Sequence, residues 1–307
     1  MRINTNISSL GAQEAAQNTN KSIANSLEKL STGLKINKAS DDASGLAIAD
    51  KLRTQVTSIN QGISNGNSAI ALLQITDKSM AEQSKILDTI KSKLIQANTD
   101  TTSTAGRTAI AKDVTKLLQQ LNNIGEQTNY NGTNLLQKAR TTLNASTEAN
   151  LTAARSAKGG LSFQIGEGTA DLITTRTINS NVAGLKLSAL AKAVRSGAKV
   201  SAGATAGTTG VFTRTMAQSG QKAIDKAITT LNGYRGDIGS TQNQVESAVR
   251  NLMTQSTNIK AAESVIRDVD YAEESANFNK LNIISQAGSY AISQSNAVSQ
   301  NVLRLLQ

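Results

Sequence analysis

The sequence predicts a mainly α-helical protein: a long antiparallel coiled-coil helical rod formed by its N- and C-terminal halves, with a small β-hairpin region in the middle. Three observations carry this prediction. The 307 residues contain no Pro, the residue that most effectively breaks a helix interior. Aromatic residues are 2% of the chain, so its interfaces must be built from small aliphatic side chains. Apolar residues also recur with heptad spacing towards both ends, which is typical of helices that pack along their length.

Two heptad stripes of equal length indicate the main helical pair. Steps of four and three from residue 52 to 94, and again from 224 to 266, each find nine aliphatic or Met residues among thirteen positions. Each stripe spans 43 residues, which is about 65 Å of helix. Stripes of equal length can cover each other, so we expect a helix seam with both termini at the same end. The seam residues are Leu52, Val56, Ile59, Ile63, Leu73, Ile224, Ile228, Val245, Val249 and Leu252.

The apolar stripes of the first and last forty residues are thinner. A lone helix with so narrow a stripe buries too little surface to offset the entropy of its ordering. We therefore expect both terminal segments to be poorly ordered in the free monomer and helical once neighbouring copies cover them. The residues expected to matter for this polymerisation are Ile3, Ile7, Leu10, Leu27, Leu30, Leu34, Leu281, Ile284, Val298, Val302, Leu303, Leu305 and Leu306.

The middle of the chain predicts shorter elements. A polar stretch at 98–106 predicts a turn, after which the apolar spacing of 110–124 predicts a helix that folds back. Residues 161–166 and 171–175 have the β-branched and aromatic content of short strands. Residues 196–210 hold four Gly and predict a flexible turn or loop. We interpret the whole middle as a small decoration that is too poor in apolar residues to be a second domain.

The residue inventory excludes most catalytic and metal chemistry. The chain has no His and no Cys, so it lacks an imidazole base, a thiolate, a disulfide and the usual ligands of zinc, copper or haem. We expect no catalytic residue, no cofactor and no metal. No apolar run reaches the roughly 18 residues that a membrane span needs, so we expect no membrane insertion. The polar first ten residues lack the apolar core of a cleavable signal peptide.

The net charge of +10 allows an anionic partner, but its distribution argues otherwise. Residues 1–50 and 221–307 are each neutral, whereas 51–140 and 141–220 each carry +5. The basic residues there are scattered singly, and aromatic side chains that could stack on bases are nearly absent. We therefore predict a solvated positive face and no nucleic-acid partner.

Several motifs allow two interpretations, and the structural one is favoured each time. Asp41 and Asp42 could form a carboxylate pair for acid–base catalysis, but we predict that Ser40 or Asp41 caps a helix that begins near Ala43. The acidic stretch 268–274 could suggest calcium, but it lacks EF-hand spacing, so we predict a joint between helices. Four glycines could be hinges, but close packing is favoured: Gly33, Gly62, Gly66 and Gly288.

Several motifs, in chain order, resemble a known family. Residues 27–37 (LEKLSTGLKIN) and 41–49 (DDASGLAIA) resemble the N-terminal signature of bacterial flagellins. Residues 129–136 (NYNGTNLL) and 163–166 (FQIG) resemble internal segments of the same family, and 282–306 resembles its C-terminal signature. The resemblance covers about 1–190 and 217–307, and several motifs in the family's order make it highly specific.

The resemblance implies a layered fold and a function. Residues 1–42 and 268–307 would form an inner coiled coil, 43–190 and 217–267 a helical layer with a β-hairpin, and 191–216 a short residual variable insertion. The chain would be a structural subunit, not an enzyme, that self-assembles into the hollow helical filament used for swimming. Besides itself, its implied partners are an export chaperone, the type III export apparatus, the filament cap and hook-junction proteins. Two alternatives stay open: a hook–filament junction protein and, less favoured, a basic coiled coil that binds nucleic acid.

The resemblance also points to one surface segment and to possible modification. Family members that trigger the vertebrate Toll-like receptor for flagellin carry Arg, Arg, Glu and Leu where this chain has Thr89, Lys91, Ser92 and Lys93. The sequence is similar here to flagellins of the Campylobacter and Helicobacter type, so we expect weak or no activation of that receptor. O-linked glycans on exposed Ser and Thr of 141–220 are implied by resemblance alone. The full receptor segment is Leu87, Asp88, Thr89, Ile90, Lys91, Ser92, Lys93 and Leu94.

One departure concerns the C-terminal helix. The family commonly has Pro shortly before its final signature, where this chain has Ser299. Without that Pro a helix can continue through the position, so we expect a straighter C-terminal helix and no loss of assembly.

Overall fold

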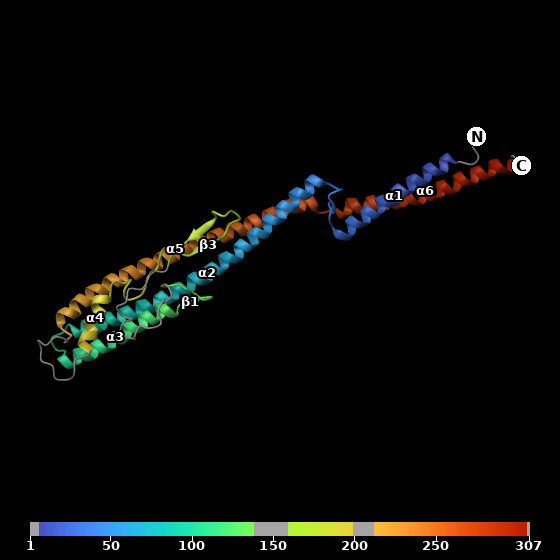
Figure 1. Cartoon of the computed structure of the whole chain (residues 1–307). Helices are drawn as coiled ribbons and strands as arrows, with labels where there is room; N and C mark the ends of the chain where they lie inside the picture. The colour runs from blue at the N-terminus through green and yellow to red at the C-terminus, as the bar shows by residue number, and fades with distance from the viewer. Residues whose placement is uncertain (1–5, 138–158, 199–211, 306–307) are drawn as a thin grey trace. The chain divides into compact units, whose positions relative to one another are not determined.

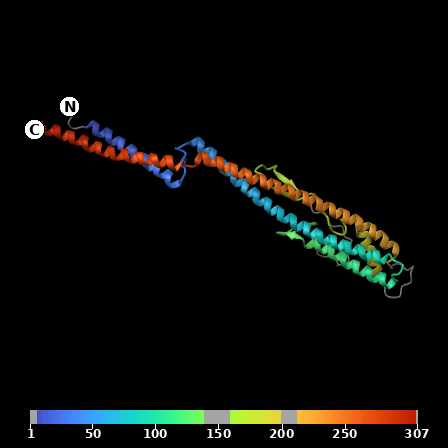
Figure 2. The ribbon, with the colours of Figure 1, turned by 180° about the vertical axis from the view of Figure 1, so that it is seen from behind.

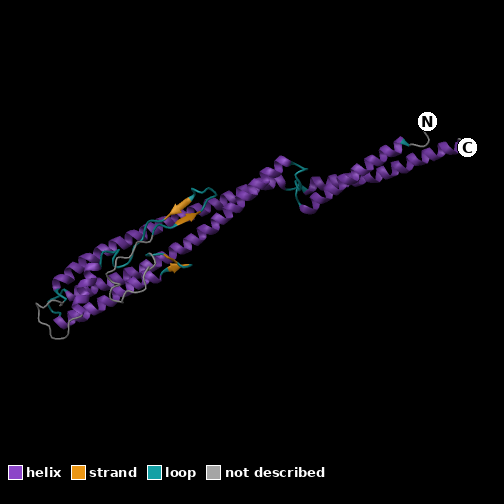
Figure 3. Cartoon of the chain, in the orientation of Figure 1, coloured by secondary structure: helices purple, strands orange, loops and turns teal. Residues whose placement is uncertain are grey.

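A computed structural model describes residues 6–137, 159–198 and 212–305 (Figure 1). In these ranges the chain forms six helices and two small antiparallel sheets, and Figure 3 shows how far helix dominates. The prediction of a mainly helical protein with a small β-hairpin region is therefore confirmed. The helices are α1 (Ile7–Thr32), α2 (Ala43–Ala97), α3 (Thr104–Gln127), α4 (Ser188–Ala198), α5 (Arg214–Arg267) and α6 (Tyr271–Leu305). Helix α6 continues through Ser299, as expected where no Pro interrupts it.

The chain divides into two compact units. We call Met1–Thr57 with Thr254–Gln307 the terminal unit, and Ser58–Met253 the central unit. Helices α2 and α5 each contribute to both units, because the divisions at 57/58 and 253/254 fall inside them. The predicted layers divide instead at 42/43 and 267/268, where the helices themselves break. The compact units reflect packing within the chain, whereas the layers come from the family resemblance and stay a prediction.

In the terminal unit, α1 and α6 lie side by side and antiparallel, as both views show (Figures 1 and 2). Helix α1 ends at Gly33, whose φ of 74° is the left-handed conformation that glycine adopts most easily. The Gly33 N–H donates to the carbonyl of Lys29, which closes the last turn of the helix. The role of this glycine is therefore that of a C-cap. The two terminal segments are helical here, and their order in the free monomer stays a prediction.

Backbone hydrogen bonds join the two chain segments that connect the helices of the terminal unit. Lys35 N donates to the carbonyl of Arg267 over 2.6 Å, and Val269 N donates to the carbonyl of Gly33 over 3.0 Å. Between these bonds, Leu34 and Asp268 form an antiparallel bridge. Asp270 then caps α6, because its Oδ1 accepts from the N–H of Ala272 at 2.9 Å. The predicted joint at 268–274 thus consists of a three-residue break and the first turn of α6.

The cap of α2 differs by one residue from the prediction. Asp42 Oδ1 accepts from Gly45 N at 2.9 Å, so Asp42 is the N-cap, and neither Ser40 nor Asp41 is. Asp41 instead closes the preceding loop, where its Oδ2 accepts from the N–H groups of Lys38 (3.0 Å) and Asn37 (3.1 Å). These two bonds favour the ionised carboxylate and hold the pKa of Asp41 below its usual value. Both carboxylates accept hydrogen bonds from backbone N–H groups, so the two do not form the catalytic acid–base pair that the sequence also allowed.

The central unit has an apolar core between α2, α3, α4 and α5. Its largest fully buried side chains include Leu73, Met80, Leu87, Leu118 and Phe212. Helix α3 runs back along α2, as the polar stretch after α2 predicts (Figure 1). Ser103 caps it, because its Oγ accepts from Gly106 N at 3.1 Å. The central core buries many large aliphatic side chains, whereas α1 and α6 fully bury none among their described residues.

Two glycines allow close packing in the central unit, as predicted. A Cβ on Gly62 would overlap the backbone oxygen of Ile165, and a Cβ on Gly66 would overlap a methyl group of Val249. Gly62 thus lets the β3 region approach α2, and Gly66 lets α5 approach it. Gly288, in the terminal unit, is less constrained, since a Cβ there would only touch Ala16 at 3.9 Å.

Two hairpins complete the central unit. Strands β1 (Asn129–Tyr130) and β2 (Thr133–Asn134) pair antiparallel around a turn in which both central residues have positive φ. This is the Asn-Gly turn typical of a tight hairpin. Strands β3 (Ser162–Gln164) and β4 (Leu172–Thr174) form the second hairpin, which is the one predicted from residues 161–166 and 171–175. Asn65 on α2 holds it by donating from Nδ2 to the Gln164 carbonyl at 3.1 Å.

The middle of the chain is better packed than the sequence indicated. Residues 196–198, predicted as loop, form the last turn of α4, whereas 199–210 lie outside the described residues. Helix α4 packs on α3 and buries Leu190, Ala191 and Val194 in the common core. The interpretation of this region as a decoration is therefore wrong for α4. Its high content of small residues concealed a short helix whose large aliphatic side chains, Leu190 and Val194, are buried.

Candidate assembly surface

The contact between α1 and α6 includes small and polar residues. Asn6 Nδ2 donates to the carbonyl of Ser295 at 3.2 Å, and Ser26 Oγ donates to Glu274 Oε1 at 2.5 Å. Farther along, Ala16 lies opposite Gly288. Ser26 is the one buried residue among the described side chains of the two helices. Hydrogen bonds therefore contribute to this pair, because its described apolar side chains, among them Leu30, Phe278 and Leu281, are at most half-buried.

The outer faces of the same two helices carry the large apolar residues. Ile7 is 69% exposed, Ile283 67% and Tyr290 73%. We call the terminal apolar surface the set Ile7, Leu10, Leu27, Ile283, Ile284, Tyr290 and Val298, all of which are exposed. This distribution is the reverse of that in the central unit, where residues of the same types line the core.

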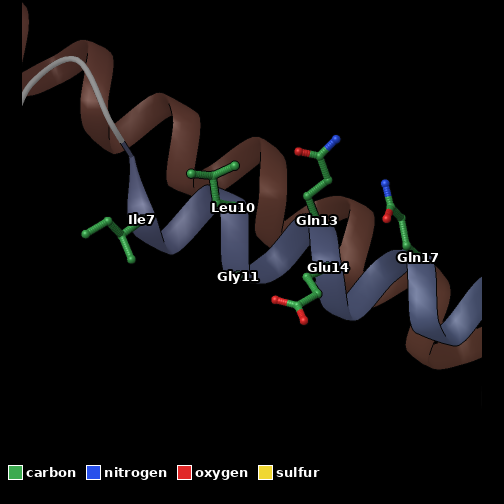
Figure 4. Close-up of a pocket in the computed structure, with 6 residues that line it drawn as sticks. All are labelled: Ile7, Leu10, Gly11, Gln13, Glu14 and Gln17. Atoms are coloured by element: carbon green, nitrogen blue, oxygen red, sulfur yellow. The ribbon is translucent and has the colours of Figure 1, made fainter.

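The N-terminal part of this surface is a shallow groove along α1. Ile7, Leu10 and Gly11 line it together with the polar residues Gln13, Glu14 and Gln17, and all six come from one helix (Figure 4). Gly11 has no neighbouring atom where a Cβ would stand. The groove therefore lies open, with an apolar end at Ile7 and Leu10.

The structure places the predicted polymerisation residues as follows. Ile7, Leu10, Leu27, Ile284 and Val298 belong to the terminal apolar surface. Leu30, Leu34 and Leu281 are half-buried. Ile3 and Leu306 lie outside the described residues, and Val302, Leu303 and Leu305 lie in the last stretch of α6, whose side chains are not described.

The predicted seam residues lie on α2 and α5. Within the central unit, Ile59, Leu73, Ile224, Val245 and Val249 are buried, whereas Ile63, Ile228 and Leu252 are half-buried against the core. Within the terminal unit, Val56 is buried and Leu52 half-buried. Polar contacts also join α2 and α5, because Arg235 Nε lies 2.9 Å from Asp77 Oδ1.

The predicted receptor segment divides between core and surface. Leu87, Ile90 and Leu94 are fully buried, and the residues that face solvent are Asp88, Thr89 and Ser92. Two lysines at the border form ion pairs with neighbouring helices: Lys91 Nζ lies 2.7 Å from Asp225 Oδ1, and Lys93 Nζ 3.4 Å from Asp113 Oδ2. Of this segment, only the residues between the buried positions are available to another protein.

Sequence reasoning missed two members of the terminal apolar surface, Ile283 and Tyr290. Ile283 directly precedes Ile284, which the heptad step selects, so one of two adjacent isoleucines had to leave the stripe. Tyr290 is one of four tyrosines in the chain. Because aromatic residues are so rare in this sequence, a tyrosine near the C-terminus was the signal that could have marked Tyr290 as part of the surface.

Neither a metal centre nor a membrane span emerges from the structure. Over residues 6–137, 159–198 and 212–305, we find no group of three acidic side chains placed to hold a metal ion. In the same ranges, no helix combines the length and the apolarity that crossing a bilayer requires.

A helical pair with no fully buried apolar side chain among its described residues, and with large apolar side chains exposed, is typical of a structural protein that assembles with further chains. Comparison with known proteins identifies the family. Residues 3–141 match the family model of the bacterial flagellin N-terminal helical region, and residues 221–306 that of the C-terminal helical region. The chain belongs to the bacterial flagellins, the subunit proteins of the flagellar filament.

Similar proteins support this assignment over the full length. The chain is 33% identical to the flagellin of Bacillus subtilis, and 31% identical to a 33 kDa flagellar filament core protein of Treponema phagedenis, with 100% of both chains covered in each case. It is 28% identical to flagellin A of Helicobacter pylori, with 99% of each chain covered. Among solved structures, a flagellar hook-associated protein of Vibrio parahaemolyticus matches with a TM-score of 0.59, 13% identity, and coverage of 74% of this chain and 99% of that one. At that identity the likeness concerns the fold alone.

Proposed function

We propose that copies of this flagellin polymerise by burying the terminal apolar surface of α1 and α6 against one another. One observation carries the proposal. Among the described side chains of these helices only Ser26 is buried, whereas Ile7, Ile283 and Tyr290 are each more than two-thirds exposed. Residues 1–42 and 268–307 would then form the inner coiled coil of the filament, as the family resemblance implies.

The energetics favour assembly over a stable lone pair. Burial of one exposed Leu or Ile side chain contributes about 1.5–3 kcal/mol. The terminal apolar surface holds several such residues on two helices, so contacts with neighbouring copies add up over a small area. The free monomer gains little of this from Ile7, Ile283 and Tyr290, because these side chains are each more than two-thirds exposed.

Electron microscopy of the purified chain tests the proposal. Short filament seeds or a salting-out agent are added to monomer, and the product is examined by negative staining. We expect long uniform filaments that return to monomer on mild heating. Persistent monomers or small oligomers, in the presence of seeds that extend with another flagellin, would contradict the proposal.

A hook–filament junction protein is the alternative that the sequence left open, and the match to flagellins over the full length favours the filament subunit. The two roles differ in copy number, since a filament subunit is by far the most abundant protein of sheared filaments. Quantitative mass spectrometry of sheared filaments therefore separates them. Retention on DNA that falls steeply with salt would instead support a nucleic-acid role, which the scattered positive charge does not favour.

We infer that the chain leaves the cell through the flagellar type III export apparatus, guided by its N-terminal segment and by a chaperone that binds α6. The exposed apolar residues of α6 fit a chaperone because they need cover before assembly. We also infer that the filament cap and the hook-junction proteins contact the chain and that it has no enzymatic activity. A pull-down with α6 as bait tests the chaperone, and a variant with polar substitutions at Ile283 and Tyr290 should lose it.

We propose that this flagellin activates the vertebrate Toll-like receptor for flagellin weakly or not at all. Thr89 and Ser92 are exposed and offer no charge, and Lys93 is engaged by Asp113. A guanidinium at position 89 would add a fork of donors that Thr lacks. The test is a receptor reporter assay with purified monomer, compared with a variant carrying Thr89→Arg, Lys91→Arg, Ser92→Glu and Lys93→Leu. Full signalling by the natural chain would contradict the proposal.

We propose that Ser and Thr residues of 141–220 carry O-linked glycans, as the family resemblance implies. Intact-mass measurement of protein from its own cells, set against protein made in a host without the glycosylation enzymes, tests them. Equal masses would contradict the proposal.

A further inference from the structure

We propose that Asn131 is a site of spontaneous deamidation, a covalent modification that turns its carboxamide into a carboxylate. The inference does not depend on the assembly proposal. It starts from three Asn-Gly dipeptides in the chain, at 65–66, 131–132 and 232–233. The structure places them in three different environments, and only one of these permits the reaction.

The reaction needs a glycine nitrogen that can reach the preceding side chain. The Gly132 nitrogen loses its proton to hydroxide and attacks Cγ of Asn131. As the N–Cγ bond forms, the Cγ–Nδ2 bond breaks, and ammonia leaves with a proton from water. The resulting succinimide ring then takes up water at either carbonyl and opens to aspartate or isoaspartate. Hydroxide is formed again when water protonates the leaving ammonia, so only water is consumed and no oxidant, cofactor or enzyme is required.

The β1–β2 turn leaves both reacting groups accessible. Asn131 and Gly132 are exposed, and no atom lies within 4 Å of the position of a Cβ on Gly132. In the described part of the chain no hydrogen bond holds the Asn131 carboxamide. Two residue pairs, Asn129 with Asn134 and Tyr130 with Thr133, make up the whole ladder. So short a hairpin opens at low cost, and opening gives the nitrogen the freedom that the attack needs.

The two other Asn-Gly dipeptides are protected by helices. Asn65 and Gly66 lie within α2, where Gly66 is buried and Asn65 donates to the Gln164 carbonyl. Asn232 and Gly233 lie within α5, and both are exposed. A glycine N–H inside a helix donates to the carbonyl four residues earlier, so its nitrogen is not free. Asn232 is therefore the matched control: it has the same dipeptide and similar exposure, but a different backbone.

The product changes the hairpin. Either form adds a negative charge at the tip of the turn. Isoaspartate also routes the main chain through the former side chain, which lengthens the turn by one atom and breaks the pairing of Tyr130 with Thr133. Leu135 and Leu136, both fully buried, follow β2 directly. Isoaspartate at 131 therefore loosens the edge of the core as well as the turn.

Peptide mapping by mass spectrometry tests the proposal. The full-length protein is incubated at mildly alkaline pH, once folded and once in denaturant. It is then moved into denaturant-free buffer at mildly acidic pH, which slows the reaction and still allows a short digestion with trypsin. Peptides 54–78, 117–138 and 227–235 carry one Asn-Gly each. Fragmentation locates the mass gain of NH₂ to OH, and isoaspartate methyltransferase labels the isoaspartate product.

In the folded protein we expect Asn131 to deamidate on the order of tenfold or more faster than Asn232, because opening α5 costs far more than opening the turn. In denaturant the three sites should react at similar rates. The variant Asn131→Gln should lose the fast site and leave the rates at Asn65 and Asn232 unchanged. Equal or slower reaction at Asn131 than at Asn232 in the folded protein would overturn the proposal, as would the absence of reaction at all three sites.

Discussion

The terminal and central units use the same kinds of residue in opposite ways. In the central unit, Leu73, Met80 and Leu87 are fully buried. In the terminal unit, Leu10, Ile283 and Tyr290 are exposed, and Ser26 is the buried residue of α1. Apolar burial within one copy therefore stabilises the central unit. In the terminal pair no described apolar side chain is fully buried, and we propose that the exposed ones are buried by other copies.

The difference suggests that the central core determines the stability of the monomer and that the terminal apolar surface determines assembly. A substitution in the central core should change the free energy of unfolding of the monomer. A substitution on the terminal apolar surface should change the concentration at which filaments form, with the monomer unaffected.

The largest effect on the monomer is expected from Leu87→Ala. Leu87 is fully buried among α2 and its neighbours, and truncation of such a residue costs about 2–5 kcal/mol through lost burial and the remaining cavity. Leu27→Ala, at a position 54% exposed on α1, should change the same quantity by less than about 0.5 kcal/mol. Denaturant unfolding of monomers gives both values. A loss at Leu27 as large as that at Leu87 would remove the distinction between the units.

A pair of glycine substitutions should give effects of opposite sign within the central unit. Gly66→Ala places a methyl group against Val249 and should destabilise the monomer by about 1–3 kcal/mol. Gly233→Ala meets no neighbouring atom in α5 and should stabilise it by up to about 1 kcal/mol, because alanine favours helix. Thermal unfolding of the two variants checks the signs. If both shift the midpoint in the same direction, the close approach of α2 and α5 at Gly66 is not a packing constraint.

Removal of the α2 cap should have a moderate effect. Asp42→Ala deletes the acceptor for Gly45 N and should cost about 0.5–2 kcal/mol, whereas Asp42→Asn keeps an acceptor and should cost less. Helix content followed by circular dichroism during unfolding measures both. Since the cap lies in the terminal unit, this tests whether local hydrogen bonds stabilise that unit in the monomer. Identical values for the two variants would argue against capping by Asp42.

The smallest effect is expected from the ion pair between Arg235 and Asp77. Both side chains are about one-third exposed, and such pairs contribute about 0.2–1 kcal/mol. A double-mutant cycle with Arg235→Ala and Asp77→Ala should give a coupling in that range which shrinks as salt is added. A coupling that is larger and insensitive to salt would mean that polar contacts, and not only the apolar core, hold α2 to α5.

Much of the fold follows from periodicity in the sequence. The spacing of four and three from Leu52 and from Ile224 predicts α2 and α5, because a long helical pair needs a repeating apolar stripe and little else. The strands at 162–164 and 172–174 follow from β-branched and aromatic residues. The cap of α2 was missed by one position, because Ser40, Asp41 and Asp42 all have side chains that cap helices. Which of them reaches the helix N–H groups depends on the loop, where Asp41 binds Lys38 and Asn37.

The assembly surface was harder to predict. A thin stripe such as Ile7 and Leu10 indicates that a helix has an apolar face, but not whether that face meets its own chain or another copy. The pairing of α1 with α6 also involves the hydrogen bonds of Asn6 and Ser26, which a pattern of hydrophobic residues does not mark. Helix α4 was missed for a related reason, because Ala, Ser and Gly outnumber its few buried aliphatic residues.

The most direct test of the central claim compares two isoleucines of nearly equal exposure, Ile284 in the terminal unit (42%) and Ile75 in the central unit (40%). Each is changed to Ser, and two quantities are measured: the free energy of unfolding of the monomer and the concentration at which seeded filaments stop growing. We predict that Ile284→Ser raises the concentration at which seeded filaments stop growing about tenfold or more, in line with about 1.5–3 kcal/mol of lost burial. We expect Ile75→Ser to leave filament growth nearly unchanged. In both variants the free energy of unfolding of the monomer should equal that of the natural chain. Equal loss of filament growth in the two variants would contradict the central claim.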